Sequence, residues 1–214
     1  MVIQNKEAYK VIIKEGVGEI IEKKSRFIAT VKKVETEEEA FSFIDGLKKK
    51  YWDASHNCSA MVIGGQVKLT RCSDDGEPSG TAGRPILEVL LGENLCDVAV
   101  VVTRYFGGTL LGTGGLIRAY TQATKEGLLN CTIGCMRPGV QIKLVTDYNN
   151  IGKILYFLGE KNIVPENSEY TDSVCLYLLF PLEWKEEIIK ELTEMTAGKI
   201  DVEILQEINY VDKK

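Results

Sequence analysis

Two glycine-dense segments of this chain carry the side chains most suited to chemistry. The first, residues 73–85, contains three acids and three hydroxyl side chains, and the second, residues 104–118, begins and ends with an arginine. The candidate site residues among these acids and hydroxyls are Asp74, Asp75, Glu77, Ser79 and Thr81. Glycine loses much backbone entropy on folding, so clusters this dense indicate tight turns or a backbone that approaches a partner closely. They raise the hypothesis of a site for a phosphate-bearing partner.

The second segment has the position of an anion-binding turn. It follows residues 97–103, a β-branched run typical of a buried strand, and precedes a helical pattern over 116–129. A helix N-terminus offers free N–H groups, arginine pairs with phosphate, and aromatic rings stack on unpaired bases. The predicted phosphate- or nucleic-acid-binding residues are Arg104, Tyr105, Phe106, Gly107, Gly108, Gly112, Thr113, Gly114, Gly115 and Arg118, with Arg26 and Arg84 from outside the segment.

The strict nucleotide motifs are not met. Gly107 and Gly112 have the Walker A spacing, but Thr113 and Gly114 stand where that loop needs Lys and then Ser or Thr. Gly112 also begins a dinucleotide fingerprint, yet Ile117 replaces its last glycine. The alternative is that the glycines only permit close strand–helix packing. Their density favours a functional role.

The acids of the first segment have two interpretations. Asp74, Asp75 and Glu77 could hold a hard cation such as Mg²⁺, or they could cap turns, since Asp-Gly and Glu-Pro are natural turn pairs. Structural turns are the preferred interpretation, and no metal site is predicted. The acids, Ser79 and Thr81 are kept as accessory site residues.

His56 is the chain's one histidine, and Cys58 lies two residues away. In an extended segment both would point to the same side, so a Cys–His nucleophilic pair is conceivable. Neighbours in sequence seldom form such a pair, and a lone histidine is more often packed or capping. We therefore predict no catalytic residue and retain His56 as an accessory site residue.

Composition is that of an ordinary protein from a reducing compartment. The 214 residues are 44% hydrophobic and 27% charged, and the six cysteines are scattered without zinc-site spacing. The first residues lack the apolar stretch of a secretory signal, and no apolar run approaches the roughly 18 residues that span a bilayer. We expect a cytoplasmic protein without a membrane partner.

Charge is unevenly distributed. The net charge of −5 argues against a general duplex-binding protein. Residues 1–137 carry 18 basic and 17 acidic side chains, whereas residues 138–214 carry 8 and 14. A local basic site therefore remains available in the first part, while the acidic second part is a poor candidate for attracting nucleic acid.

Hydrophobic periodicity predicts the elements that position these residues. Thr36 with Glu39 has capping-box spacing and starts a helix with an acidic first turn and a basic last turn. A hairpin is expected through Gly64 and Gly65. The other predicted elements of the first part are strands at 9–22, 25–34, 58–64, 66–73 and 97–103 and helices at 85–91 and 116–129.

A turn-rich stretch at 134–139 is the predicted boundary between domains of residues 1–135 and 136–214. The second domain is expected to have strands at 139–146, 162–170, 173–180 and 200–208, with helices starting near Tyr148 and around Trp184. The order β-α-β-β-α-β is the ferredoxin-like arrangement.

Several motifs together resemble the YigZ/IMPACT family. They are Lys24-Ser25-Arg26-Phe27, Ala54-Ser55-His56-Asn57-Cys58, residues 74–83 (DDGEPSGTAG) and residues 102–116 (VTRYFGGTLLGTGGL). They fall in order over about residues 15–130, and the last matches the family signature closely. The remainder of the chain suits the bacterial two-domain branch.

The resemblance implies an α+β protein. Its first domain would be of the ribosomal-protein/elongation-factor type, a mixed sheet with helices on one face and a left-handed βαβ crossover. Its second domain would be ferredoxin-like and similar to the C-terminal domain of elongation factor G. The eukaryotic branch regulates translation through a kinase pathway, using an N-terminal RWD domain for which this chain has no room.

Two classes of function follow. The first is a non-enzymatic cytoplasmic protein linked to translation, which contacts RNA or the ribosome through the Arg/Gly-rich surface. The second is a phosphate-loop enzyme or a binder of a nucleotide or phosphorylated metabolite, with Mg²⁺ held by the acids of the first segment. Binding is favoured over catalysis because no convincing general base or nucleophile stands out, and no cofactor is predicted.

Overall fold

The computed structural model describes residues 8–65 and 68–212, and it is an α+β protein with two antiparallel sheets. By its internal contacts the chain divides into two compact units. The N-terminal unit comprises Ala8–Met136 with residues 211–212, and the C-terminal unit comprises Arg137–Tyr210. One five-stranded sheet lies wholly within the N-terminal unit, with the order β2-β3-β6-β4-β5.

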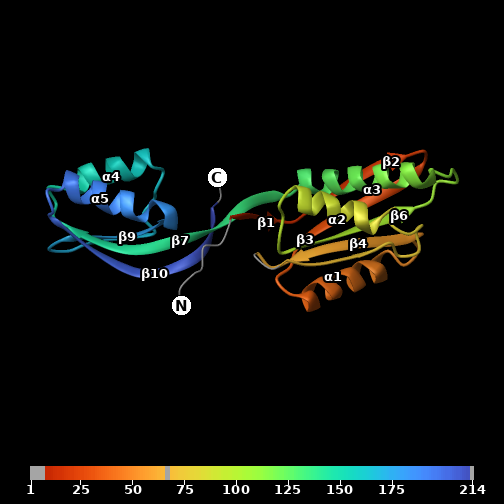
Figure 1. Ribbon diagram of the computed structural model, residues 1–214, viewed down its shortest axis with the longest axis horizontal. Coiled ribbons are helices and arrows are strands. Elements are labelled where there is room, and N and C mark those ends of the chain that lie inside the picture. The colour runs from red at the N-terminus through yellow and green to blue at the C-terminus, as the bar shows by residue number, and fades with distance from the viewer. Residues whose placement is uncertain (1–7, 66–67, 213–214) are drawn as a thin grey trace. The chain divides into compact units, whose positions relative to one another are not determined.

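The N-terminal unit builds this sheet from five strands and covers it with three helices (Figure 1). In chain order, the elements are β2 (Gly16–Glu22), β3 (Ser25–Lys33), α1 (Glu37–Lys50), β4 (His56–Ile63), β5 (Leu69–Ser73), α2 (Gly83–Gly92), β6 (Val98–Tyr105) and α3 (Gly112–Leu129). β4 and β5 pair as predicted, with Ile63 opposite Leu69. Residues 66–67 of the predicted second hairpin strand lie outside the described residues.

β6 is the central strand, and both of its faces are buried. Val98, Val100 and Val102 pack toward α2 and α3, whereas Ala99 and Val101 pack toward α1. Figure 1 shows α2 and α3 on one side of the sheet and α1 on the other. The expected mixed sheet with helices on one face is therefore wrong: the strand pairs are antiparallel and both faces are covered. The uninterrupted β-branched run was the signal for two buried faces.

The predicted cap of α1 is confirmed. The Thr36 hydroxyl accepts a hydrogen bond from the Glu39 N–H at 3.2 Å, and the Glu39 carboxylate accepts one from the Glu35 N–H at 2.7 Å. Three glutamates occupy the first turn and three lysines the last, as the helix dipole favours.

The strand predicted at 9–22 is two strands in different sheets. β1 (Tyr9–Lys14) pairs with β7 (Thr132–Thr146), and β2 pairs with β3. The break follows from close packing: a Cβ on Gly18 would lie 2.4 Å from the backbone of Glu126, so β2 runs directly against α3. Glycine within a strand pattern is a signal for such an approach.

The turn predicted at 134–139 is also wrong, because these residues lie inside β7. Met136 ends the register with β1, and Gly139 opens the register with β9 (Val174–Pro181). Pro138 falls between the two registers, where its missing N–H costs neither of them a hydrogen bond. Proline there is compatible with a continuous strand.

The C-terminal unit has the predicted element order and places its helices on one face of the sheet (Figure 1). Its elements after β7 are α4 (Ile151–Glu160), β8 (Asn167–Tyr170), β9, a short 3₁₀ turn (Leu182–Trp184), α5 (Lys185–Met195) and β10 (Ile200–Asp212). The strand order is β10-β7-β9-β8. Leu144, Leu176 and Phe180 of the sheet pack with Ile154 and Ile188 of the helices.

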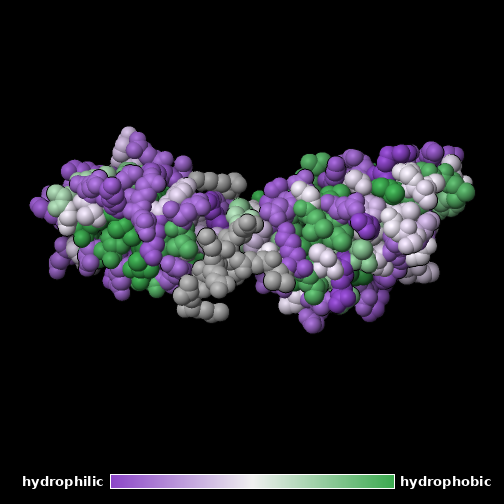
Figure 2. All heavy atoms as spheres, viewed as in Figure 1, coloured by the Kyte–Doolittle hydropathy of each residue, from purple (hydrophilic) through white to green (hydrophobic). Residues whose placement is uncertain are grey.

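Hydrophilic residues cover most of the face of each unit seen in Figure 2, with smaller hydrophobic patches between them. Among the described residues, no helix is both long and apolar enough to cross a membrane.

Candidate functional site

The two glycine-dense segments meet at one pocket of the N-terminal unit. Its volume is about 460 Å³. The pocket combines three ionisable side chains with the loop after β6 and the start of α3. Its lining residues are His56, Gly76, Glu77, Pro78, Arg104, Phe106, Leu110, Leu111, Gly112, Thr113 and Leu116.

Strand register brings the ionisable groups together. His56 begins β4 and lies opposite Arg104 on β6. Side chains alternate along a strand, so Arg104 shares the face of Val100 and Val102, which is the face covered by α2 and α3. The loop between β5 and α2 then places Glu77 beside Arg104.

Glu77 and Arg104 form a buried ion pair. Nη1 of Arg104 donates to Oε1 of Glu77 at 2.6 Å, and side-chain exposure is 6% for the arginine and 2% for the glutamate. The Tyr120 hydroxyl of α3 donates to the same oxygen at 2.7 Å. Burial raises the pKa of Tyr120, as do its neighbours Cys58 and Glu77, so the phenol stays protonated and acts as a fixed donor.

Arg104 is further enclosed by aromatic rings. Its guanidinium carbon lies 5.3 Å from the centre of the Phe27 ring and 5.5 Å from that of Phe106. Nη2 also approaches Oγ of Ser25 at 3.4 Å. The predicted phosphate contact is therefore an internal cation whose charge is balanced by Glu77.

Cys58 and His56 do share a strand face, as predicted, but Cys58 is no activated nucleophile. Its Sγ lies 3.0 Å from the backbone oxygen of Asp74 and 3.3 Å from the Tyr120 hydroxyl. Burial raises the pKa of the thiol to about 12. A thiolate is needed for nucleophilic attack, so this cysteine is inert at neutral pH.

Asp74 and Asp75 hold the first segment in place. Asp74 accepts backbone hydrogen bonds from Gly80, Ala82 and Gly83 at 2.8–3.0 Å. Burial alone would raise the pKa of Asp74, but these three bonds lower it overall. Asp75 accepts from Nζ of Lys48 at 2.6 Å and from a backbone N–H of β4 at 2.7 Å, and its pKa is likewise lowered despite burial.

The carboxylates proposed for Mg²⁺ are thus bound by protein donors. Within residues 8–65 and 68–212, no group of three or more His, Cys, Asp or Glu residues is arranged to hold a metal ion. The hydroxyl of Thr81 donates to the Pro78 carbonyl at 2.6 Å and stabilises the same loop, whereas Ser79 is exposed. These contacts support the turn-capping interpretation of the acids.

The second segment is anchored at its beginning and exposed beyond it. The N–H of Phe106 donates to Ser55 and that of Gly107 to Ser25. A Cβ on Gly107 would lie 2.0 Å from the Lys24 backbone, so this position accepts only glycine. Phe106 is 48% exposed and Leu110 83% exposed.

α3 begins at Gly112, four residues before the predicted start. Its N-terminus has no side-chain cap and no acidic residue in the first turn. The packing of α3 against β2 and β3 outweighs the poor helix propensity of Gly112, Gly114 and Gly115.

The four predicted arginines do not gather on one surface. Arg118 lines a separate hollow of about 450 Å³ with Lys23, Gly115 and Leu111, and Leu111 also lines the first pocket. Arg26 precedes the buried Phe27 on β3, so it points to the other face of the sheet, where it pairs with Glu19 at 2.6 Å. Arg84 is exposed on α2 and pairs with Glu88.

Tyr105 ends β6 and donates from its hydroxyl to Asp53 at 3.0 Å. Gly108 has a φ of +83°, with open space around its Cα, and so has Gly112 at +70°. These glycines shape the loop without packing against other groups.

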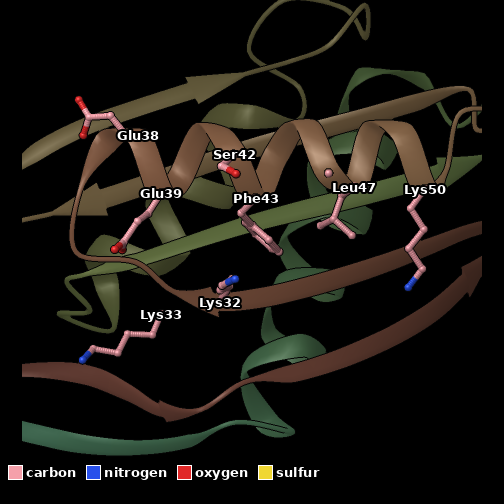
Figure 3. Close-up of a pocket in the computed structure, with 9 residues that line it drawn as sticks. Lys32, Lys33, Glu38, Glu39, Ser42, Phe43, Leu47 and Lys50 are labelled. Carbon is pink, nitrogen blue, oxygen red and sulfur yellow. The ribbon is translucent and has the colours of Figure 1, made fainter.

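A larger hollow of about 850 Å³ lies between α1 and β3 and was missed by the sequence analysis (Figure 3). Phe43 and Leu47 point from α1 into it, Lys32 and Lys33 border it from β3, and Lys50 lies at the end of the helix. Glu38 and Glu39 line the same hollow, so its charge is mixed. No spacing in the sequence marks it, because it arises where α1 leaves part of the sheet uncovered.

Sequence comparison places this two-unit α+β architecture among known proteins. The model of the Impact N-terminal domain matches residues 23–128, and a domain of unknown function (DUF1949) matches residues 144–199. IMPACT family member YvyE of Bacillus subtilis is 41% identical over 96% of this chain and 94% of its own length. IMPACT family member YigZ of Escherichia coli is 34% identical over 86% of this chain and 92% of its own.

A crystal structure described as that of a hypothetical protein is similar in fold, with a TM-score of 0.59 and 31% identity over 94% of this chain and 98% of that one. The chain belongs to the IMPACT family, with the two-domain organisation of the bacterial YigZ and YvyE type. Three of the four motifs that carry this resemblance contribute residues to the pocket at the end of β6.

Proposed function

We propose that this chain is a non-enzymatic, cytoplasmic protein linked to translation that binds single-stranded RNA across the N-terminus of α3. The observation that carries the proposal is the hollow shared by Lys23, Arg118 and the first turn of α3. It adjoins the pocket at the end of β6 through Leu111. The cations of the hollow could then contact phosphates, while Phe106 of the adjoining pocket could contact a base.

Unpaired cations are the first support. Lys23, Lys24 and Arg118 are exposed, and none of them forms an ion pair within the described part of the chain. Glu22 lines the same hollow, so the local excess of positive charge is small. A short single strand is therefore a better partner for this surface than a duplex.

The loop after β6 is the second support. Phe106 and Leu110 present apolar surface to solvent, and the α3 N-terminus presents uncapped N–H groups. Figure 2 shows near-neutral and hydrophobic residues at the end of the N-terminal unit where β6 leads into α3. Stacking on aromatic rings combined with backbone contacts is the usual way of binding single strands without sequence readout.

The remaining inferences concern fold and role. We propose domains of residues 1–135 and 136–214, the first of the ribosomal-protein/elongation-factor type with a left-handed crossover from β3 through α1 to β4. The second is proposed to be ferredoxin-like, supported by its strand order β10-β7-β9-β8. The link to translation rests on the family resemblance.

The phosphate-loop enzyme has no comparable observation in its favour. Its Mg²⁺ ligands would be Asp74, Asp75 and Glu77, whose oxygens already accept hydrogen bonds from protein donors. No residue of the pocket is placed as an activated nucleophile, since burial keeps Cys58 protonated.

Fluorescence anisotropy with a labelled single-stranded oligonucleotide tests the proposal. We expect binding that weakens steeply with salt, because each phosphate contact contributes about −0.7 to the slope of log K against log salt. The double variant Lys23→Gln/Arg118→Gln should lower this slope by about 1.4 if both residues contact phosphate. The matched control Lys10→Gln/Lys190→Gln removes the same charge from two residues that have carboxylate partners, and it should bind as the wild type does. Absent or salt-independent binding contradicts the proposal.

A further inference from the structure

The pocket at the end of β6 holds two hydrogen-bond acceptors side by side. Nδ1 of His56 lies 2.9 Å from the backbone oxygen of Asp75. A carbonyl only accepts, so Nδ1 carries the ring proton, and Nε2 of this tautomer is left as an acceptor. Nε2 lies 3.9 Å from Oε2 of Glu77, a carboxylate whose other oxygen already accepts from Arg104 and Tyr120.

The imidazole nitrogen and the carboxylate oxygen could both accept hydrogen bonds from one donor group that carries two hydrogens. At 3.9 Å the two atoms are too far apart to bond directly, and both belong to residues that line the pocket. An amino group can donate a hydrogen bond to each acceptor, because one N–H can point to the imidazole and the other to the carboxylate.

Phe106 supplies a flat surface on the same pocket. Its ring lies against the Arg104 guanidinium, which Phe27 and Glu77 hold from other sides. The ring is therefore fixed in place by a buried cation, yet 48% of the residue is exposed. A preorganised aromatic ring of this kind suits stacking with a planar, uncharged group.

The start of α3 supplies the third element. Gly112 and Thr113 line the pocket at the uncapped end of the helix, where the dipole and free N–H groups favour an anion. The pocket thus presents acceptors for an amino group, a ring for stacking and a helix end for a negative charge. A nucleotide whose base has an exocyclic amine carries all three complements.

We propose that the pocket lined by His56, Glu77 and Phe106 receives one unpaired RNA base that carries an exocyclic amino group, with its phosphate at the start of α3. The inference rests on the proposed RNA binding and adds a base preference to it. Cytosine and adenine have an amino group on the edge that unpaired bases present, whereas uracil has a carbonyl there. A carbonyl oxygen would face two acceptors and be repelled.

Oligocytidylate and oligouridylate of equal length provide the test, because their bases differ only along this edge. Cytosine has an amino group and an unprotonated N3 there, whereas uracil has a carbonyl and an N3–H. We expect anisotropy titrations to show about tenfold tighter binding of oligocytidylate, the effect of roughly 1.4 kcal/mol. Oligoadenylate should bind more tightly than oligouridylate as well. The same titration with free cytidine monophosphate as competitor distinguishes a site for the base within RNA, which the monophosphate displaces weakly, from a site for free nucleotides.

Two variants locate the preference. His56→Ala removes one of the two acceptors and leaves Glu77 with its Arg104 pair. It should therefore lower the ratio of cytidylate to uridylate affinity severalfold. Phe106→Ala removes the stacking surface and should weaken the binding of both oligonucleotides about 5- to 150-fold, the equivalent of roughly 1–3 kcal/mol. Thermal unfolding of both variants checks that they remain folded.

The outcomes separate this inference from the function on which it rests. Equal affinity of the wild-type protein for all three oligonucleotides overturns the base preference and leaves RNA binding intact. A preference that is unchanged in His56→Ala also overturns it, because the imidazole then takes no part in recognising the amino group. Binding of none of the oligonucleotides removes the proposed function itself, and preferential capture of the free monophosphate replaces the RNA base by a small-molecule ligand.

Discussion

The two glycine-dense segments are similar in glycine content but differ in their contacts: the first is held by hydrogen bonds within the protein, and most of the second is exposed. The segment before α2 is closed on itself, because Asp74, Asp75 and Glu77 are all bound by donors of the protein. The segment after β6 is fixed at Phe106 and Gly107 and is open from there to the start of α3.

Their glycines differ in the same way. A Cβ on Gly83 would lie 2.7 Å from the backbone of Ser73, so this glycine allows α2 to begin directly against β5. Gly108 and Gly112 have positive φ and empty surroundings, so they are needed for the path of the chain and not for packing. Glycine density alone therefore does not distinguish a structural loop from a binding loop. The two kinds of loop are distinguished by whether the neighbouring carboxylates accept hydrogen bonds from the protein itself.

The largest effect is expected from removing the buried acid of the first segment, which tests whether that segment is held by its carboxylates. Glu77→Ala leaves Arg104 buried between two aromatic rings without its counter-charge, and we expect the free energy of unfolding to fall by about 3–5 kcal/mol. Urea denaturation followed by circular dichroism measures the loss.

Glu88→Ala is the matched control, because it removes a glutamate whose pair with Arg84 is exposed. Its effect should stay below about 0.5 kcal/mol. If the two variants lose the same stability, the ion pair of the closed segment is no more than a surface contact.

Asp74→Asn should have a smaller effect, about 2 kcal/mol at neutral pH, since the amide is a weaker acceptor for three backbone N–H groups. The folded-state pKa of Asp74 lies below its ordinary value of 3.8. Its contribution is therefore fully present above the pKa of the unfolded chain and is lost as the pH falls through the folded pKa.

The stability difference between wild type and Asp74→Asn should accordingly be constant from pH 7 to about pH 5 and shrink below pH 4. Denaturant titrations at a series of pH values measure it. A difference that is unchanged down to pH 3 would show that the charge of Asp74 is not what holds the loop.

The smallest effect is expected in the exposed segment after β6, where a substitution tests whether the loop packs against other groups. Leu110 is 83% exposed, and Leu110→Ser should change the free energy of unfolding by less than about 0.5 kcal/mol. Thermal denaturation measures this directly. A loss above 1 kcal/mol would mean that the open segment is packed against other groups, contrary to its exposure.

Local patterns predicted those parts of the fold in which each residue acts through its near neighbours. The cap at Thr36, the buried run of β6 and the pairing of β4 with β5 were all predicted correctly. The division of residues 9–22 between two sheets was not predictable by periodicity, because it depends on α3 approaching Gly18 from more than a hundred residues away.

The candidate site shows the same limit. Arg104 was predicted to contact phosphate, but alternation from Val100 and Val102 already places this side chain on the inward face of β6. A buried arginine requires an acid, and the chain offers several within the first segment. Only the fold identifies Glu77 as that acid. The two residues are 27 positions apart, and the loop between β5 and α2 brings Glu77 to Arg104 on β6.

The position of β6 has a consequence for the timescale on which the site exists. Because this strand is central in the sheet and covered by helices on both faces, its amides can exchange with solvent only when the N-terminal unit opens as a whole. Arg104, and through it the Phe106 ring, are therefore attached to the slowest-opening part of the unit. The open loop can fluctuate in nanoseconds to microseconds while its anchor persists until global unfolding.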